Sequence, residues 1–252
     1  MDIGKNEHLK RKVALITGGS SGIGKAIAKR FAGEGCNLVL SARNEKRLDS
    51  VKKSIQDDFT DVKISSIPTD IKKEEQVKEM VERCINEMGR LDILVNNAGI
   101  IRYGELENFS SKDFQDVMET NVYGTFYVTK AALPHLKGSQ GNLIFIGSFD
   151  ANHPRSFNPI YCSSKWWTKG FAHSVESIVG KDGVAVTLIN PSEVRTDIPD
   201  EDGEAYKEKF DEGEVTEPEE IAEAVVFAAK QSKTTTLSQI DIYRRDKLSD
   251  FF

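Results

Sequence analysis

The sequence predicts a doubly wound α/β fold in one domain, and three observations support this prediction. Short apolar runs rich in β-branched residues alternate along the chain with longer segments of helical spacing. Most of these runs are continuously apolar, which is typical of strands buried on both faces of a parallel sheet. A glycine-rich loop joins the first run to the first helical segment. The expected strands are residues 12–17, 37–42, 62–67, 91–96, 142–147, 184–190 and 237–243.

The helical segments carry their apolar residues on one stripe, as an amphipathic helix does. The first places Ile23, Ile27 and Phe31 on one face. The segment 216–230 is expected to open with a capping box from Thr216 to Glu219.

Residues 196–214 are polar and strongly acidic, and we expect them to form a surface excursion that acts as a substrate lid. No linker or repeat divides the chain, so residues 1–252 are expected to form a single domain.

Charge and composition exclude several classes of protein. The net charge is -6, so no basic stripe is available to bind nucleic acid. No apolar run approaches the ~20 residues that span a bilayer, and the early apolar run is too short for a signal peptide. Cys36, Cys84 and Cys162 form no CxxC pair, which favours free thiols over a disulfide framework or a metal site. We expect a soluble cytoplasmic protein without a metal.

The glycine loop "TGGSSGIG" (17–24) is typical of a dinucleotide-binding turn. The first glycine allows a tight turn, the second lets the backbone approach a pyrophosphate, and the third allows close packing of helix on sheet. The phosphates would lie at the N-terminus of the helix, where free N–H groups favour negative charge. The residues expected to bind the cofactor here are Gly18, Ser20, Ser21, Gly22, Ile23 and Gly24.

The end of the second strand is expected to choose between the two nicotinamide cofactors. An acid there binds the ribose 2′-hydroxyl of NAD, whereas an arginine suits the 2′-phosphate of NADP. Ser41 and Ala42 stand in the place of an acid, and Arg43 follows them. The sequence therefore favours NADP(H), with NAD(H) as the alternative.

The stretch "YCSSK" (161–165) places Tyr161 and Lys165 one helical turn apart on one face. A lysine ammonium close to a tyrosine favours the phenolate and lowers the tyrosine pKa, which would make Tyr161 a general acid and base. Ser148 lies at the carboxyl end of an expected strand, where open α/β sheets present ligands. It is a candidate hydrogen-bond donor to a reacting oxygen.

From about residue 10 to residue 243 the chain resembles the short-chain dehydrogenase/reductase family, in its compact single-domain branch. The motifs that carry the resemblance occur in the family's order: "TGGSSGIG" (17–24), "TDI" (69–71), "NNAG" (96–99), "METNVYGTF" (118–126), Ser148, "YCSSK" (161–165) and "NPSEVRT" (190–196). The resemblance implies a Rossmann-type sheet of seven parallel strands. It also implies a homotetramer or homodimer in which the Tyr161 helix lines a dimer face.

The resemblance implies a role for each matching residue. Tyr161 would be the catalytic acid/base, Lys165 would tune it and hold the nicotinamide ribose, and Ser148 would orient the substrate oxygen. Asn121 would hold a water for a proton relay through Lys165, or would only kink its helix. The other residues implied to bind the cofactor are Asp70, Ile71, Asn96, Ala98, Gly99, Pro191, Val194 and Thr196.

The sequence departs from the family pattern at several positions. Ser192 replaces the glycine that usually follows the proline, and we expect a differently shaped loop there. Arg102, His153 and Arg155 stand near the expected substrate mouth. Each is either a substrate contact or a solvated loop residue, and Arg155 could pair with a substrate carboxylate. Trp166 or Trp167 is expected to pack at a subunit interface.

These observations favour an enzyme that moves a hydride between a nicotinamide and a carbonyl or secondary alcohol. Its small-molecule substrate would be a small hydroxy acid or carbonyl compound, or alternatively a steroid or another bulky apolar ketone. A non-catalytic NADP-binding regulator on the same fold is the alternative of another class. The presence of Tyr161, Lys165 and Ser148 argues against that alternative.

Overall fold

A computed structural model describes residues 9–199 and 202–249 of the chain. Its seven strands form one all-parallel sheet in the order β3-β2-β1-β4-β5-β6-β7, as expected. Five strands, β1, β3, β4, β5 and β7, are one to three residues shorter than predicted. The strands are β1 Val13–Thr17, β2 Asn37–Ala42, β3 Ile64–Pro68, β4 Ile93–Asn96, β5 Asn142–Ile146, β6 Ala185–Pro191 and β7 Gln239–Ile242.

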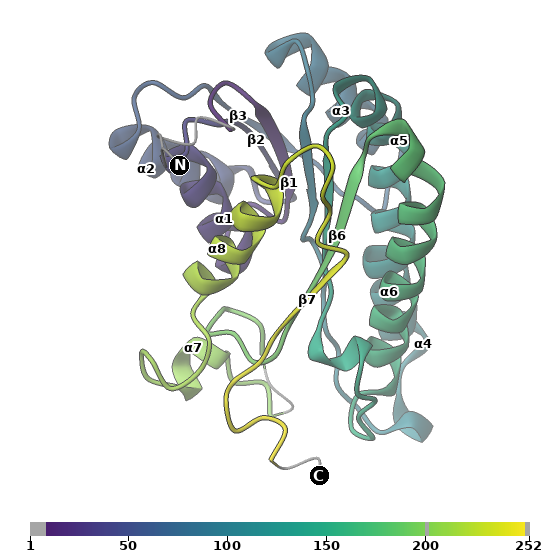
Figure 1. Cartoon of the computed structure of the whole chain (residues 1–252). Coiled ribbons are helices and arrows are strands. Elements are labelled where there is room, and N and C mark those ends of the chain that lie inside the picture. The colour runs from purple at the N-terminus through teal and green to yellow at the C-terminus, as the bar shows by residue number, and fades with distance from the viewer. Residues whose placement is uncertain (1–8, 200–201, 250–252) are drawn as a thin grey trace.

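Helices cover both faces of the sheet (Figure 1), which explains why the central strands are largely apolar. One hydrophobic core packs α1, α2 and α8 against one face, and a second core packs α3, α5 and α6 against the other. The helices are α1 Gly22–Gly33, α2 Glu45–Asp58, α3 Glu74–Met88, α4 Ser111–Val117, α5 Thr125–Ser139, α6 Pro159–Val179, α7 Tyr206–Lys209 and α8 Pro218–Ala229. No helix among the described residues is long and apolar enough to cross a bilayer.

The capping box of α8 differs by one residue from the prediction. The side chain of Glu217 accepts from the backbone of the third helical residue, and the Glu220 carboxylate accepts the Glu217 N–H at 2.8 Å. The carbonyl of Thr216 instead accepts a hydrogen bond from the backbone N–H of Arg195. Because Pro218 takes the first helical position, the cap falls on Glu217.

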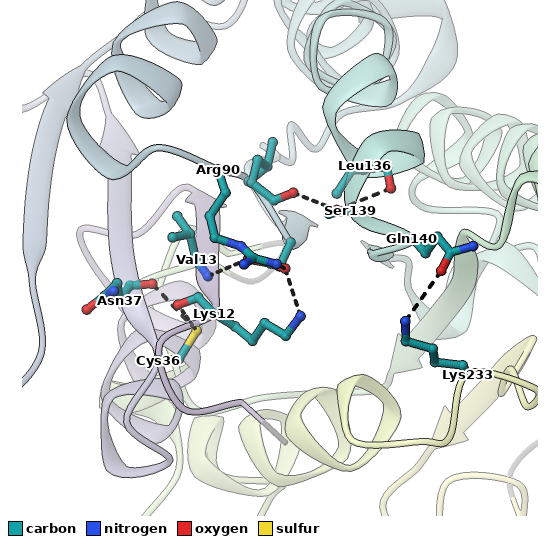
Figure 2. A network of polar contacts seen from close by, with 11 residues as sticks. Lys12, Val13, Cys36, Asn37, Arg90, Leu136, Ser139, Gln140 and Lys233 are labelled. Atoms are coloured by element: carbon teal, nitrogen blue, oxygen red, sulfur yellow. Dashed lines mark hydrogen bonds and ion pairs between the residues drawn. The ribbon is translucent and has the colours of Figure 1, made fainter. Parts of the chain in front are cut away.

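A buried carboxylate joins β1 to β4 at the amino ends of the strands. Asp92 accepts the backbone N–H of Val13 at 3.0 Å, and its carboxylate also binds Lys12 and Arg90. Figure 2 shows Lys12, Val13 and Arg90 converging at this place. Burial by itself raises the pKa of Asp92, but the two cations and the N–H outweigh it and hold that pKa below its ordinary value.

The strand order reverses between β1 and β4, since the chain runs outward on one side to β3 and on the other side to β7. At such a switch point the loops from the carboxyl ends of neighbouring strands diverge and leave a crevice. The loops that follow β1, β4, β5 and β6 carry most of the predicted site residues. The topology therefore brings these residues to one edge of the sheet.

Candidate active site

A cavity of about 450 Å³ lies at the carboxyl ends of the strands. It extends from Arg43 and Arg47, which follow β2, to Ser148 after β5 and to Tyr161 and Lys165 on α6. We call these two parts the arginine end and the tyrosine end. The strands β2 and β5 are three steps apart in the sheet, or ~14 Å at the usual strand spacing. The cavity is therefore long enough for an extended ligand.

The glycine loop has the backbone shape that the sequence predicts. Gly18 and Gly22 have φ values of 67° and 49°, in the left-handed region that favours glycine. A Cβ added at Gly24 would lie 2.3 Å from the carbonyl oxygen of Gly18, so this glycine permits close packing and does not itself line the cavity. A Cβ at Gly22 would lie 3.2 Å from Cγ2 of Thr196. The loop and the predicted Thr196 therefore meet across the middle of the cavity, which Ser20, Ser21 and Ile23 also line.

The arginine end contains a second cation that the sequence analysis missed. Arg47, in the first turn of α2, lines the cavity together with Arg43. Asn44 caps this helix by accepting the N–H of Arg47 at 3.0 Å, which fixes how the helix begins. Arg47 could have been identified from the sequence as a second candidate, since it lies only four residues after Arg43. The predicted Asp70 and Ile71 line the same end.

The loop after β4 differs from the expectation at one position. Asn96 is buried and donates from Nδ2 to Oγ1 of Thr129 at 2.9 Å, so it faces the helices and does not line the cavity. Asn97 lines the cavity instead and donates to the carbonyl of Thr17 at 2.9 Å. The reason is the alternation of strand side chains, which sends neighbours to opposite faces. Ala98 and Gly99 line the cavity as expected.

Asn121 lies in a π-helical segment, Met118–Gly124, that joins α4 to α5. Its Nδ2 donates to the Ile100 carbonyl at 2.9 Å and to Oγ of Ser164 at 3.0 Å, and its Oδ1 accepts the Ile100 N–H at 2.8 Å. A Cβ at Gly99 would lie 3.4 Å from this Oδ1 and 3.7 Å from Nζ of Lys165. Asn121 thus holds the loop after β4 against α6, beside the lysine.

Ser148 is positioned by a residue that the sequence analysis did not identify. Asn190, the last polar residue of β6, accepts the Ser148 N–H on its Oδ1 at 3.2 Å. A Cβ at Gly147 would lie 2.0 Å from that same oxygen, so glycine is required before the serine. The Ser148 hydroxyl accepts the N–H of Asp150 at 3.1 Å, which leaves its own hydrogen to donate elsewhere.

Tyr161 and Lys165 lie in the first turns of α6, and both line the cavity. Nζ of Lys165 is 5.6 Å from the centroid of the Tyr161 ring and donates to the Ile146 carbonyl at 2.9 Å. Burial lowers the pKa of Lys165 to about 8.

The tyrosine pKa differs from the prediction. Burial and then the charge of Asp150 raise the pKa of Tyr161, while a hydrogen bond with Ser148 partly opposes them. The predicted lowering by Lys165 is not what the structure gives, because the ammonium points to the Ile146 carbonyl and the phenol is enclosed. Tyr161 is therefore a neutral phenol near pH 7, which is the form of a proton donor.

Arg155 is neither a solvated loop residue nor a free cation. Its Nε is 2.8 Å from Oδ1 of Asp150, and its Nη2 is 3.5 Å from Oε1 of Glu193. Lys247, from the C-terminal segment, binds the same Glu193 oxygen. We call Asp150, Arg155, Glu193 and Lys247 the ion cluster. Three of its members line the tyrosine end of the cavity, namely Asp150, Arg155 and Glu193.

The loop after β6 brings Pro191, Val194 and Thr196 to the cavity, as predicted. Ser192 keeps φ out of the left-handed region, so the glycine usually found here is not needed for this backbone. Its N–H instead donates to the Ile242 carbonyl at 2.9 Å, and its hydroxyl accepts the Arg244 N–H at 2.9 Å. The serine therefore fastens the C-terminal segment to the site.

The predicted lid, residues 196–214, contributes Asp197, Ile198, Pro199 and Tyr206 to the cavity wall. Residues 200 and 201 of this segment lie outside the described part of the chain. The segment contains the short helix α7, which leads to α8. The segment therefore borders the cavity through a few of its residues, and its role as a lid stays a prediction.

The remaining residues flagged in the sequence divide between the cavity and the surface. Arg102 lines the cavity but is 43% exposed in its side chain and lies 3.4 Å from Asp113. His153 stacks on Phe149 with ring centroids 4.4 Å apart and is not a cavity residue. Trp167 stacks on Phe171 at 4.6 Å, whereas Trp166 is 48% exposed. Neither tryptophan lines the cavity.

Asn158, directly before α6, was also missed. It is buried and lines the tyrosine end, and its Nδ2 and Oδ1 have no hydrogen-bond partner among the described residues. At the other end, Oγ of Ser41 is likewise buried without a partner there. Together with the glycine cradle and the paired arginines, such polar groups fit a dinucleotide: phosphates at the loop, a 2′-substituent at Arg43 and a nicotinamide near Tyr161.

Comparison with known proteins agrees with this geometry. Residues 12–207 match the family model of the short chain dehydrogenases. An uncharacterised oxidoreductase of Staphylococcus aureus is 34% identical over 93% of this chain and 97% of its own length.

Solved structures give the same result. The alcohol dehydrogenase of Thermococcus sibiricus, complexed with 5-hydroxy-NADP, superposes with a TM-score of 0.84 at 28% identity, over 92% of this chain and 95% of its own. The 3-ketoacyl-(acyl-carrier-protein) reductase of Brucella melitensis, complexed with NADH, has a TM-score of 0.83 at 28% identity. The match covers 93% of this chain and 98% of that reductase.

Proposed function

Because the chain belongs to the short-chain dehydrogenase/reductase family and is an oxidoreductase with a nicotinamide cofactor, we propose that it uses NADP(H) to reduce a carbonyl or oxidise a secondary alcohol, with Tyr161 as the acid/base. The observation that carries this proposal is the meeting of Ser148, Tyr161 and Lys165 at one end of a cavity whose other end holds two arginines.

The residues of the tyrosine end have distinct roles in the proposed reaction. The bound cofactor supplies or accepts the hydride. In reduction, the neutral Tyr161 phenol donates its proton to the carbonyl oxygen, and the Ser148 hydroxyl donates a hydrogen bond to the same oxygen. Lys165, when protonated, stabilises the phenolate that remains.

Asn121 is proposed to hold a water beside Lys165. Its two amide hydrogens are committed to Ile100 and Ser164, but Oδ1 has a second lone pair. The position of Oδ1 near Lys165, on either side of Gly99, supports a proton path from Tyr161 through the lysine.

The proposed preference for NADP(H) rests on Arg43 and Arg47. No acid occupies position 41 or 42, and both guanidinium groups border the cavity where the 2′-phosphate would lie. We expect Arg43→Ala and Arg47→Ala each to weaken NADPH binding about tenfold or more while NADH binding changes little. Lys46→Ala is the matched control, because Lys46 is exposed on the same turn and does not line the cavity.

Fluorescence titration of both cofactors measures this preference. Tighter binding of NADH than NADPH by the wild type would contradict the proposed cofactor. It would leave the proposed chemistry at Tyr161 standing, because that chemistry uses either cofactor.

Two further proposals concern the molecule as a whole. We propose a homodimer or homotetramer, because α6, α5 and the π-helical segment Met118–Gly124 carry exposed apolar side chains, namely Trp166, Ile178, Phe126 and Tyr123. A monomeric mass in sedimentation would refute this. We also propose a cytoplasmic location, which the three free cysteines support.

A further inference from the structure

The cation that could bind a substrate carboxylate is already committed. Arg155 pairs with Asp150 and Glu193, and only 17% of its side chain is exposed. Its guanidinium also lies over the rings of Phe149 and Phe157, at 4.9 and 5.4 Å from their centroids. Its charge and its faces are therefore both occupied by the protein.

The ion cluster as a whole is balanced. It contains two carboxylates and two cations, and Lys247 binds the same Glu193 oxygen as Arg155 does. The side chains of Asp150, Glu193 and Lys247 are only 7, 11 and 9% exposed. Burial by itself raises the pKa of Glu193, but Lys247 and Arg155 outweigh it and keep that pKa low. Burial raises the pKa of Asp150, and the charge of Arg155 opposes this rise.

The other cations that line the tyrosine end are also committed. Lys165 donates to the Ile146 carbonyl beside Tyr161, and Arg102 lies against Asp113 and donates to the Ile101 carbonyl. Arg43 and Arg47 are at the arginine end, three strands away. A carboxylate that bound Arg155 or Lys247 would have to break a buried pair and would leave Asp150 or Glu193 uncompensated, which is strongly unfavourable. The pair of Arg102 with Asp113 is by contrast half exposed.

Aromatic side chains form part of the wall of the tyrosine end. Tyr103 and Phe157 stack with ring centroids 6.3 Å apart and an interplanar angle of 22°. Tyr206 and Ile198 of the lid line the same part of the cavity, as does Phe149. Burial raises the pKa of Tyr103, so its hydroxyl is neutral. Such walls fit a flat or alicyclic ring, which can stack on them.

From these observations we infer that the substrate is an uncharged, ring-bearing carbonyl compound or the corresponding alcohol, and that the balanced ion cluster of Asp150, Arg155, Glu193 and Lys247 excludes carboxylate substrates. This inference rests on the proposed function and deepens it. Reduction of such a compound adds a hydride from the reduced cofactor to the carbonyl carbon and the Tyr161 proton to the oxygen. Of the substrate classes that the sequence left open, the structure favours the apolar ketone over the small hydroxy acid.

The test compares two matched pairs of probes with the wild-type protein and NADPH. Methyl benzoylformate and benzoylformate share a ring and a ketone and differ in charge, and methyl pyruvate and pyruvate are their ring-less counterparts. We expect kcat/KM for methyl benzoylformate to exceed that for benzoylformate by about two orders of magnitude or more. We also expect it to exceed that for methyl pyruvate by about tenfold or more, because the ring is buried against aromatic walls.

A variant tests the cause of the exclusion. Glu193→Gln converts the balanced ion cluster to a net positive one, so the ester-to-acid ratio of kcat/KM should fall by about tenfold or more. Glu208→Gln makes the same change of charge on the exposed helix α7, away from the cavity wall, and should leave the ratio unchanged. The wild-type comparison stands by itself if Glu193→Gln fails to fold.

The possible failures are distinguishable. Reduction of benzoylformate or pyruvate in preference to the esters would overturn the inference and leave the proposed function intact. An unchanged ester-to-acid ratio in folded Glu193→Gln would overturn the role of the ion cluster. Absence of NADPH oxidation with all four probes and with a broad panel of other carbonyls would contradict the proposed function itself.

Discussion

Replacing Lys165 with methionine should stabilise the protein in the absence of cofactor while it damages the site. Burial lowers the pKa of Lys165 from 10.5 to about 8, so the fold disfavours the charged form. At about 1.4 kcal/mol per pH unit, this difference corresponds to about 3 kcal/mol at pH values below 8. Loss of the hydrogen bond to the Ile146 carbonyl destabilises the variant by about 1 kcal/mol and offsets part of this gain. We therefore expect Lys165→Met to raise the free energy of unfolding by about 2 kcal/mol near pH 7.

The pH dependence identifies the cause of this gain. Between about 8 and 10.5 the unfolded lysine holds a proton that the folded lysine has lost, so the wild type becomes more stable as pH rises through this window. Lys165→Met lacks this titration, and its advantage over the wild type should disappear by about pH 10.

Urea denaturation followed by tryptophan fluorescence measures both quantities. Lys53→Met, at an exposed position of α2, is the control and should change stability by less than about 0.5 kcal/mol. The reasoning is refuted if Lys165→Met is less stable than the wild type near pH 7. It is also refuted if the difference in stability between the two does not shrink as the pH is raised.

Three other predictions follow from single contacts. Gly24→Ala should destabilise the protein by about 1–3 kcal/mol, because its Cβ would lie 2.3 Å from the Gly18 carbonyl oxygen, whereas Gly170→Ala, with nothing within 4 Å, should be neutral or stabilising in thermal melts. Asp92→Asn should cost about 2 kcal/mol in urea denaturation. Because the folded pKa of Asp92 is lowered, the stabilisation of the fold by this carboxylate is present above about pH 4 and is lost as pH falls through the folded pKa. Equal stability of Asp92→Asn and the wild type near pH 7 would contradict this prediction. Since the pKa of Tyr161 is raised, initial rates of alcohol oxidation should increase steadily with pH above neutrality, and an oxidation rate that falls over this range would exclude the tyrosine as its base.

Much of the fold was predictable because its signals are local. Continuous apolar runs identify strands that are covered on both faces, and the glycine positions 18, 22 and 24 mark the first turn. The seven-stranded parallel sheet was correctly expected from the family motifs. The first residue of α8 was harder to predict, because both Thr216 and Glu217 can cap a helix N-terminus. Only the position of Pro218 decides between them.

The parts of the site that could not be predicted depend on long-range contacts. Asn190 and Ser148 are 42 residues apart, and the hydrogen bond between them appears only when β5 and β6 pair. Likewise, Arg155 was ambiguous in the sequence because its partner Glu193 lies on the loop after another strand. The raised pKa of Tyr161 reflects how the cavity encloses it, which the spacing of Tyr161 and Lys165 does not determine.

The most direct test of the proposed chemistry is the substitution Tyr161→Phe, which removes one hydroxyl and keeps the ring that lines the cavity. NADPH binding, measured by fluorescence titration, should be nearly unchanged. NADPH oxidation, with a carbonyl substrate that the wild type turns over, should fall by about 10²-fold or more, because the proton donor is lost. Retention of wild-type turnover by Tyr161→Phe, with normal cofactor binding, would contradict the assignment of Tyr161 as the acid/base.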